Sequence, residues 1–285
     1  MDFNQTHTRY IKAVLGSILL ACFLFAFFPT LKNLISAWSN SDEFSHGFFI
    51  IPISIFIVWQ RRATLKEIPI KPANWGLGIV MLSLLLYLLA HLAEIKTLSS
   101  ISIVVLMGGV VIYLWGLQIF KELMFPLFFL FFMIPFPSQI YSYLTIPLQL
   151  IVSQMSAGLA QLISIPLYRE GNVISLPDYT FHVVRACSGL RSMLSIMCLA
   201  AVFGYLTLRS NALRGILLIS GIPVAVLVNI VRVFLMIAIY HYFNYDLSHG
   251  SVHTLFGLSI FIIALFAVAV MKGVLSIWDK PAVQK

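Results

Sequence analysis

Nine long apolar runs constrain the fold of this chain more than any other feature. A helix that crosses the bilayer needs about 20 apolar residues, within a range of about 17–25. Barrel strands would instead alternate apolar and polar residues, and these runs do not alternate. The pattern predicts an all-α, polytopic helical membrane protein. The runs cover 11–28, 44–60, 75–93, 98–117, 123–136, 140–166, 187–208, 212–240 and 253–275.

The composition supports the same conclusion. Hydrophobic residues make up 60% of the chain and charged residues 10%, whereas a soluble domain has about 45–50% and about 25%. The net charge of +8 is expected from loop orientation, because the sequence contains no basic helix or patch that would track nucleic-acid phosphates. We therefore expect one integral membrane domain over residues 1–285, with the lipid bilayer as a partner and no nucleic acid.

Lysine and arginine residues predict the orientation of the chain, because cytoplasmic loops carry an excess of them. They require an odd number of crossings between Lys121 and Tyr168. We expect run 123–136 to cross and run 140–166, which is rich in Gln and Ser, to lie in the outer interface as an interfacial helix. The residues that mark cytoplasmic segments are Arg9, Lys12, Arg61, Arg62, Lys66, Lys71, Lys121, Arg209, Arg214, Lys272, Lys280 and Lys285.

This topology has about eight transmembrane helices, and both termini lie in the cytoplasm. Segment 167–186 is outward-facing and polar, with turn signals at Gly171-Asn172 and Pro177-Asp178. It is predicted to form two short strands or a hairpin that leads directly into Cys187. The loops expected to face outward are 29–43, 91–97, 137–186 and 241–252.

Arg232 is the clearest ionisable residue within an apolar run. A charged side chain at the centre of a span costs about 2.5–3.5 kcal/mol even on the lowest scale, so such a residue is a functional candidate. Asn229 lies three residues earlier, on the same helix face. The alternative is that Arg232 extends toward the interface or pairs with a helix carbonyl.

Cys187 and His253 lie at the outer ends of their predicted helices. A helix N-terminus favours thiolate, and Arg191, four residues after Cys187, would add positive potential. A neutral His253 can take a proton from a thiol and return it to a leaving amine. Each residue also has an ordinary interpretation, a packed small side chain for Cys187 and an interfacial histidine for His253.

The predicted topology places Cys187, Arg232 and His253 in the outer half of three consecutive helices. A cysteine, a histidine and a fixed cation are the groups needed for acyl transfer through a thioester. This chemistry requires no metal and no organic cofactor, and none is predicted. The spacing of the three residues does not by itself establish that they are in contact.

Several motifs, taken in order, resemble the exosortase/archaeosortase family of polytopic membrane cysteine transpeptidases. The resemblance covers most of the chain, with a core at about 44–275. It implies that Cys187 is the nucleophile, Arg232 the stabiliser of thiolate or oxyanion, and His253 the acid and base. Many family members have an acidic residue where this chain has Arg185. The motifs are 44–47 (FSHG), Pro52, 59–62 (WQRR), 170–177 (EGNVISLP), 186–192 (ACSGLRS), 229–232 (NIVR) and 253–257 (HTLFG).

The resemblance also implies a substrate class. Such enzymes recognise exported proteins with a C-terminal sorting signal, which comprises a short motif (Pro-Glu-Pro in the PEP-CTERM branch), one transmembrane helix and a basic cluster. The enzyme cuts at the motif and passes the acyl chain to an acceptor nucleophile, whose identity the sequence does not reveal. The site is expected to face the periplasm or cell exterior from the cytoplasmic (inner) membrane.

Five residues are candidates for substrate binding. An acidic residue in the motif would pair with Arg185, Arg191 or Arg169. Asn229 would line the site beside the catalytic arginine. His46 either lines the site or forms a hydrogen bond within the first outer loop.

Three other functions remain open. A transporter would also place Arg232 and His253 within the membrane, although the sequence shows no inverted repeat. A hydrolytic membrane protease would use the same residues, with water in place of the acceptor. A non-catalytic assembly protein would leave the buried cation Arg232 unexplained.

Overall fold

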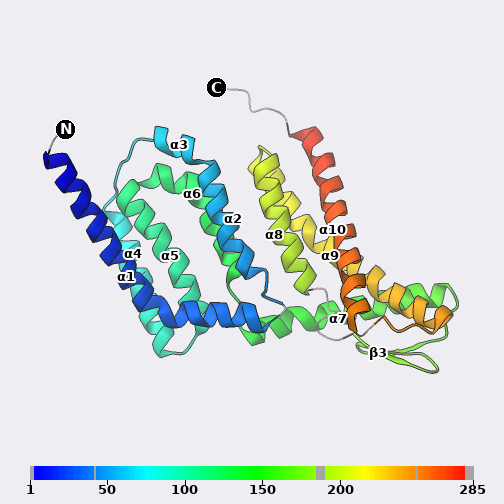
Figure 1. The fold of residues 1–285 in the computed structure, drawn as a ribbon. Helices are drawn as coiled ribbons and strands as arrows, with labels where there is room; N and C mark the ends of the chain where they lie inside the picture. Colours follow the sequence, from blue (N-terminus) through cyan, green and yellow to red (C-terminus); the bar gives the residue numbers. More distant parts are fainter. Residues whose placement is uncertain (1–2, 42, 184–189, 248–249, 280–285) are drawn as a thin grey trace. The chain divides into compact units, whose positions relative to one another are not determined.

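The computed structural model describes residues 3–41, 43–183, 190–247 and 250–279. Most of these residues are helical (Figure 1), which confirms the predicted all-α fold. The chain forms two compact units, Met1–Pro135 and Phe136–Lys285. The expectation of a single integral membrane domain stays a prediction.

In the first unit, the first helix is longer than expected. Segment 29–43 was predicted to be a loop, but α1 continues to Asn40 and bends along its length (Figure 1). Pro29 lies inside this helix, where its missing N–H and its ring favour a bend rather than an end. The elements are α1 (Phe3–Asn40), α2 (Gly47–Gln60), α3 (Arg62–Glu67), α4 (Trp75–Leu92), α5 (Lys96–Trp115), α6 (Leu117–Phe129) and the 3₁₀ helix η1 (Leu130–Met133).

Helices α4 and α5 form a closely packed pair. A Cβ atom at Gly76 would lie 2.5 Å from the backbone nitrogen of Tyr113, and one at Gly109 would lie 3.0 Å from that of Val80. Small residues let helix backbones approach in this way, and such contacts stabilise helix pairs in lipid. The side chains that pack against this pair include Phe27 of α1, which is buried.

In the second unit, α8, α9 and α10 pack side by side. Helix α7 runs across the end of this group at which α8 and α10 begin (Figure 1). The elements are α7 (Ser138–Leu162), β1 (Tyr168–Glu170), β2 (Val173–Ser175), β3 (Thr180–His182), α8 (Leu190–Thr207), α9 (Asn211–Phe243) and α10 (Gly250–Trp278).

A small antiparallel sheet, in the order β1-β2-β3, lies on the second unit. The predicted hairpin is confirmed, and a third strand extends it through the pair Ile174–Phe181. Both side chains are buried in a core shared with α9. The hydroxyl of Ser153 on α7 donates to the carbonyl oxygen of Gly171 at 2.9 Å. The sheet is therefore anchored to the helices by apolar packing and by a hydrogen bond.

Helix α7 buries small polar side chains against the protein and exposes many large apolar ones. Ser153 and Ser156 are fully buried, whereas Tyr143 is 83% exposed and Leu162 is 81% exposed. An apolar face turned away from the protein is what a lipid-contacting helix requires. A membrane-spanning helix would expose the same kind of surface, so the interfacial placement of α7 stays a prediction.

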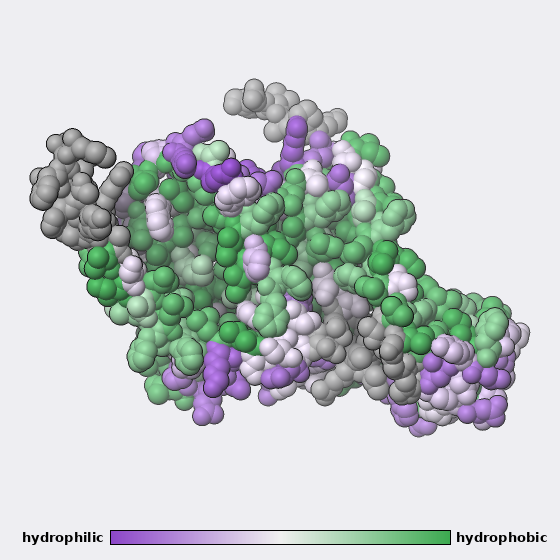
Figure 2. Space-filling model, viewed as in Figure 1, coloured by the Kyte–Doolittle hydropathy of each residue, from purple (hydrophilic) through white to green (hydrophobic). Residues whose placement is uncertain are grey.

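Five helices are long and apolar enough to cross a membrane: Val14–Asn40, Trp75–Leu92, Lys96–Trp115, Asn211–Phe243 and Leu255–Trp278. The pair Leu117–Met133 and Ser138–Leu162 passes the same test together, with a bend of 84° between them. The shorter apolar helices Gly47–Gln60 and Ser192–Thr207 would bring the total to the predicted eight, so that number stays a prediction. In Figure 2 the visible helix surfaces are mainly hydrophobic, with hydrophilic residues near their ends, as an integral membrane protein requires.

Candidate active site

Helix α9 holds Arg232 and Asn229 in the interior of the second unit. Arg232 is 9% exposed and Asn229 is 3% exposed. The two positions lie three residues apart, so they share a helix face, as predicted. Burial of a guanidinium within an apolar span is unfavourable unless polar groups surround it, which makes this face the centre of the candidate site.

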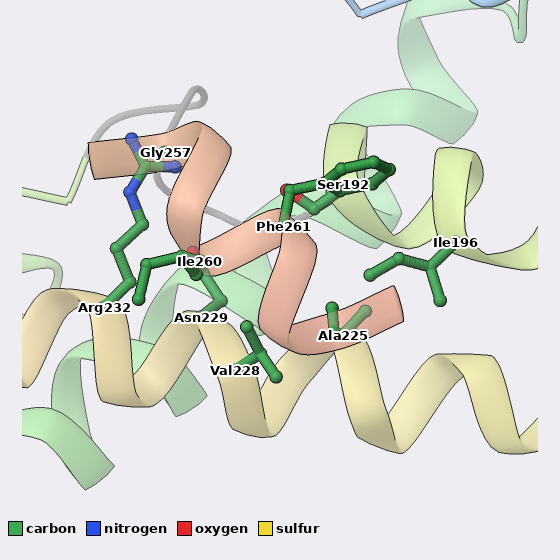
Figure 3. A pocket seen from close by; sticks show the side chains of 10 residues that line it. Ser192, Ile196, Ala225, Val228, Asn229, Arg232, Gly257, Ile260 and Phe261 are labelled. Carbon is green, nitrogen blue, oxygen red and sulfur yellow. The ribbon is translucent and has the colours of Figure 1, made fainter. Parts of the chain in front are cut away.

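The guanidinium of Arg232 lies against Gly257 of α10. A Cβ atom at Gly257 would be 3.4 Å from Nη2, 3.6 Å from Cζ and 3.7 Å from Nη1 of Arg232. Figure 3 shows the arginine side chain extending from α9 toward the turn of α10 that contains Gly257. The hydrogen atom of glycine therefore leaves space that a larger side chain would fill.

A cavity of about 10 Å³ lies beside these residues. That volume accommodates about one water molecule. Three of the lining side chains are polar, those of Ser192, Asn229 and Arg232, and the rest of the lining is mainly apolar (Figure 3). Electrostatic interactions are stronger in such surroundings than in water. The cavity is lined by Ser192, Ile196, Ala225, Val228, Asn229, Arg232, Gly257, Ile260, Phe261 and Ala264.

Cys187 and Arg185 lie outside the described residues, but both ends of their segment are described. At one end, the backbone N–H of Val183 donates to Asn172 O at 2.9 Å, and the Asn172 side-chain amide donates to Val183 O at 3.2 Å. At the other end, Ser192 lines the cavity.

His253 and Arg191 belong to described helices, α10 and α8, but their side chains lie outside the described part of the structure. Position 253 precedes Gly257 by four residues, or about 6 Å along a helix axis. The helix that contains His253 therefore contacts the Arg232 guanidinium about one turn later. Helix α8, which begins at Leu190, contributes Ser192 to the same cavity.

Two other predicted residues hydrogen-bond to backbone carbonyls. Arg169 of β1 donates from Nη1 to Gly171 O at 2.6 Å. His46 Nε2 lies 3.1 Å from Phe132 O in the first unit. Since a carbonyl oxygen only accepts, Nε2 carries the proton in this bond. The partner lies 86 residues away and outside the first outer loop, so this bond differs from the one considered, and the two roles considered for His46 stay predictions.

Gly257 and Ser192 line the cavity, and neither was predicted as a site residue. The available signal for Gly257 was its spacing of four residues from His253, which places the two positions on one helix face. Ser192 lay in the cysteine motif without an assigned role. In the described part of the chain, no group of three or more His, Cys, Asp or Glu residues could hold a metal ion.

The sequence was compared with known families and proteins. The family model described as transmembrane exosortase matches residues 38–270, a stretch that includes α2 through most of α10 and every position of the cavity. Searches of curated proteins and of solved structures each return no match. Because the family match covers most of the chain, the protein belongs to the transmembrane exosortase family, whose members are membrane-embedded protein-sorting transpeptidases.

Proposed function

We propose that this protein cleaves a C-terminal sorting tail from exported proteins through a thioester on Cys187, and transfers the acyl chain to an acceptor nucleophile. The observation that carries the proposal is the buried Arg232 guanidinium. It borders a cavity between the helix that follows Cys187 and the helix that contains His253. We place the site at the outer face of the cytoplasmic (inner) membrane, with both termini in the cytoplasm, from the distribution of basic loops.

The reaction starts when the Cys187 thiolate attacks the carbonyl carbon of the scissile peptide bond. The carbonyl electron pair moves to oxygen, and Arg232 stabilises the resulting oxyanion. His253 in its protonated form donates a proton to the leaving amine, so the C–N bond breaks and a thioester remains. The acceptor then attacks the thioester and gives its proton to His253, and the Cys187 thiolate leaves.

The cavity explains why an arginine suits this role. Its guanidinium remains charged under all physiological conditions, and the apolar lining strengthens its field at a nearby oxyanion. Asn229 lines the same cavity and provides an amide that can also donate to developing negative charge. Removal of one such preorganised donor typically lowers kcat by about 10²–10³.

Recognition of the tail is proposed to use the arginines around the cysteine segment. A glutamate in the cleavage motif would form a charge-assisted hydrogen bond with Arg185, Arg191 or Arg169. A Glu→Lys substrate should be cleaved poorly by the native enzyme. Replacement of the interacting arginine by glutamate should restore cleavage, and failure of all three reversals would contradict this pairing.

The experiment that tests the proposal is intact mass analysis of exported, tail-bearing proteins from cells with the native enzyme or Cys187→Ala. Cys22→Ala is the matched control, because Cys22 is exposed on α1. We expect loss of the tail with the native enzyme and with Cys22→Ala, but not with Cys187→Ala. A new C-terminus with added acceptor mass indicates transfer, and a free carboxylate indicates hydrolysis. Equal processing in all three strains would refute the proposal and favour a transport role.

A further inference from the structure

The first unit ends at a break in which helical hydrogen bonding cannot continue. Ile134 follows η1 in an extended conformation, as expected for a residue before proline. A continuing 3₁₀ helix would join Phe132 O to the N–H of residue 135, and an α-helix would join Met133 O to that of residue 137. Both of those residues are proline, which has no N–H to donate.

Three side chains from different parts of the unit hydrogen-bond to carbonyls of this break. The Trp38 indole donates from Nε1 to Met133 O at 2.9 Å. His46 donates from Nε2 to Phe132 O at 3.1 Å. The Thr97 hydroxyl donates to Pro135 O at 3.0 Å. Side-chain donors of this kind satisfy carbonyl oxygens that an interrupted helix leaves without a backbone N–H.

Gly47, the residue after His46, leaves room for the Trp38 indole because it has no side chain. A Cβ atom at Gly47 would clash with Nε1 of Trp38, the atom that donates to Met133. Trp38 is 6% exposed and Met133 is 5% exposed, so this contact lies in the interior of the unit. His46 therefore supplies one hydrogen-bond donor to the break. Gly47 leaves space for a second donor, the Trp38 indole.

We propose that Trp38, His46 and Thr97 form a carbonyl clamp that holds the break in one conformation, and that His46 is a positioning residue rather than a proton-transfer or substrate-binding residue. The chain passes directly from the break into α7. There, the Ser156 hydroxyl donates to Ile230 O at 3.0 Å, two residues before Arg232. The effect of the clamp on catalysis rests on the proposed function, whereas its effect on stability does not.

Two substitutions of His46 separate the possible roles. His46→Gln retains an N–H donor at nearly the position of Nε2, whereas His46→Leu removes it and leaves a part-buried carbonyl without that donor. We expect His46→Leu to lower the thermal midpoint of the purified protein by about 2–6 °C, and His46→Gln to restore most of that loss. The control pair is His91→Gln and His91→Leu, since His91 is exposed on α4, and its two variants should have similar midpoints.

Tail cleavage by the same variants supplies the second measurement. We expect His46→Gln to keep the native kcat and the native pH profile, and His46→Leu to lower kcat about tenfold without a shift of the pH profile. Two results together would overturn the proposal by showing that His46 transfers a proton. Both variants would lose activity, and the pH dependence of kcat would lose its inflection near the ordinary histidine pKa of about 6.5. Equal midpoints for His46→Gln and His46→Leu would also overturn it. If the native protein cleaves no tail, the proposed function fails, and the midpoints still test the clamp.

The steric part of the clamp has its own test. Gly47→Ala should lower the thermal midpoint, because the added methyl group meets the Trp38 indole. Gly47→Ala combined with Trp38→Leu should lose less than the sum of the two single losses, since the smaller side chain removes the clash. Strictly additive losses would contradict the contact between these two residues.

Discussion

Substitution of Gly257 perturbs Arg232 without removing it. A methyl group at this position would lie 3.4 Å from Nη2 and 3.6 Å from Cζ of Arg232. Carbon atoms pack best at about 3.5–4.0 Å, so Gly257→Ala fits in ordinary contact. Gly257→Leu adds a four-carbon side chain, whose outer atoms must enter the space of the Arg232 guanidinium or of the 10 Å³ cavity.

The expected magnitudes follow from this geometry. Gly257→Ala should lower kcat/KM by less than about tenfold, because the added methyl group fits in ordinary contact and the guanidinium keeps its position. Gly257→Leu should displace the guanidinium from the oxyanion, and loss of one such donor costs about 10²–10³ in rate. At 1.36 kcal/mol for each tenfold change, this equals about 3–4 kcal/mol of transition-state stabilisation.

The assay is the rate of tail removal by purified enzyme, with thermal unfolding recorded for each variant. Gly273 of the same helix is the matched control, since a Cβ atom there would meet nothing within 4 Å. Gly273→Leu should keep the native activity, and Gly257→Leu should lose activity while remaining folded. Native activity in Gly257→Leu would refute the argument that Arg232 acts beside this glycine.

Three further predictions follow from the packing and electrostatics. Gly76→Ala should lower the free energy of unfolding by about 1–3 kcal/mol through overpacking. Gly78→Ala should not, because a Cβ atom there would meet nothing within 4 Å. Denaturation in detergent measures both. The backbone N–H of Arg209 donates to the Asp279 carboxylate and holds its pKa below the ordinary range of an aspartate. Ionised Asp279 therefore stabilises the folded protein at pH values above the unfolded-state pKa, and this stabilisation is lost as the pH falls through the folded-state pKa. Asp279→Asn should thus reduce the dependence of the thermal midpoint on pH below about 4. Arg232→Lys should lower kcat/KM by about 10²–10³, because a lysine lacks the planar fork of donors.

Apolar runs predicted most of the helices, because a spanning helix leaves an unmistakable pattern. The run at 75–93 corresponds to Trp75–Leu92, and that at 98–117 to Lys96–Trp115. The end of α1 could not be predicted in the same way. Pro29 either ends or kinks a helix, and the sequence alone does not distinguish the two outcomes; the structure shows that α1 continues past it.

The candidate site was predicted in part. Arg232 and Asn229 were recognised because a charged residue inside an apolar run is conspicuous, and their burial on one face is confirmed. The role of Gly257 depends on how closely α9 and α10 approach, and no local sequence pattern gives that distance. Likewise, the partner of His46 lies 86 residues away, so only the folded chain shows what this histidine binds.

The central claim is that Cys187 forms an acyl-enzyme with the substrate. The most direct measurement is peptide mass spectrometry of the purified enzyme, quenched in acid soon after mixing with a tail-bearing substrate and without acceptor. We predict a substrate acyl group on the peptide containing Cys187, removable by hydroxylamine and absent in Cys187→Ala. Tail cleavage with an unmodified Cys187 at every time point, or an equal rate of cleavage by Cys187→Ala, would contradict the proposed mechanism.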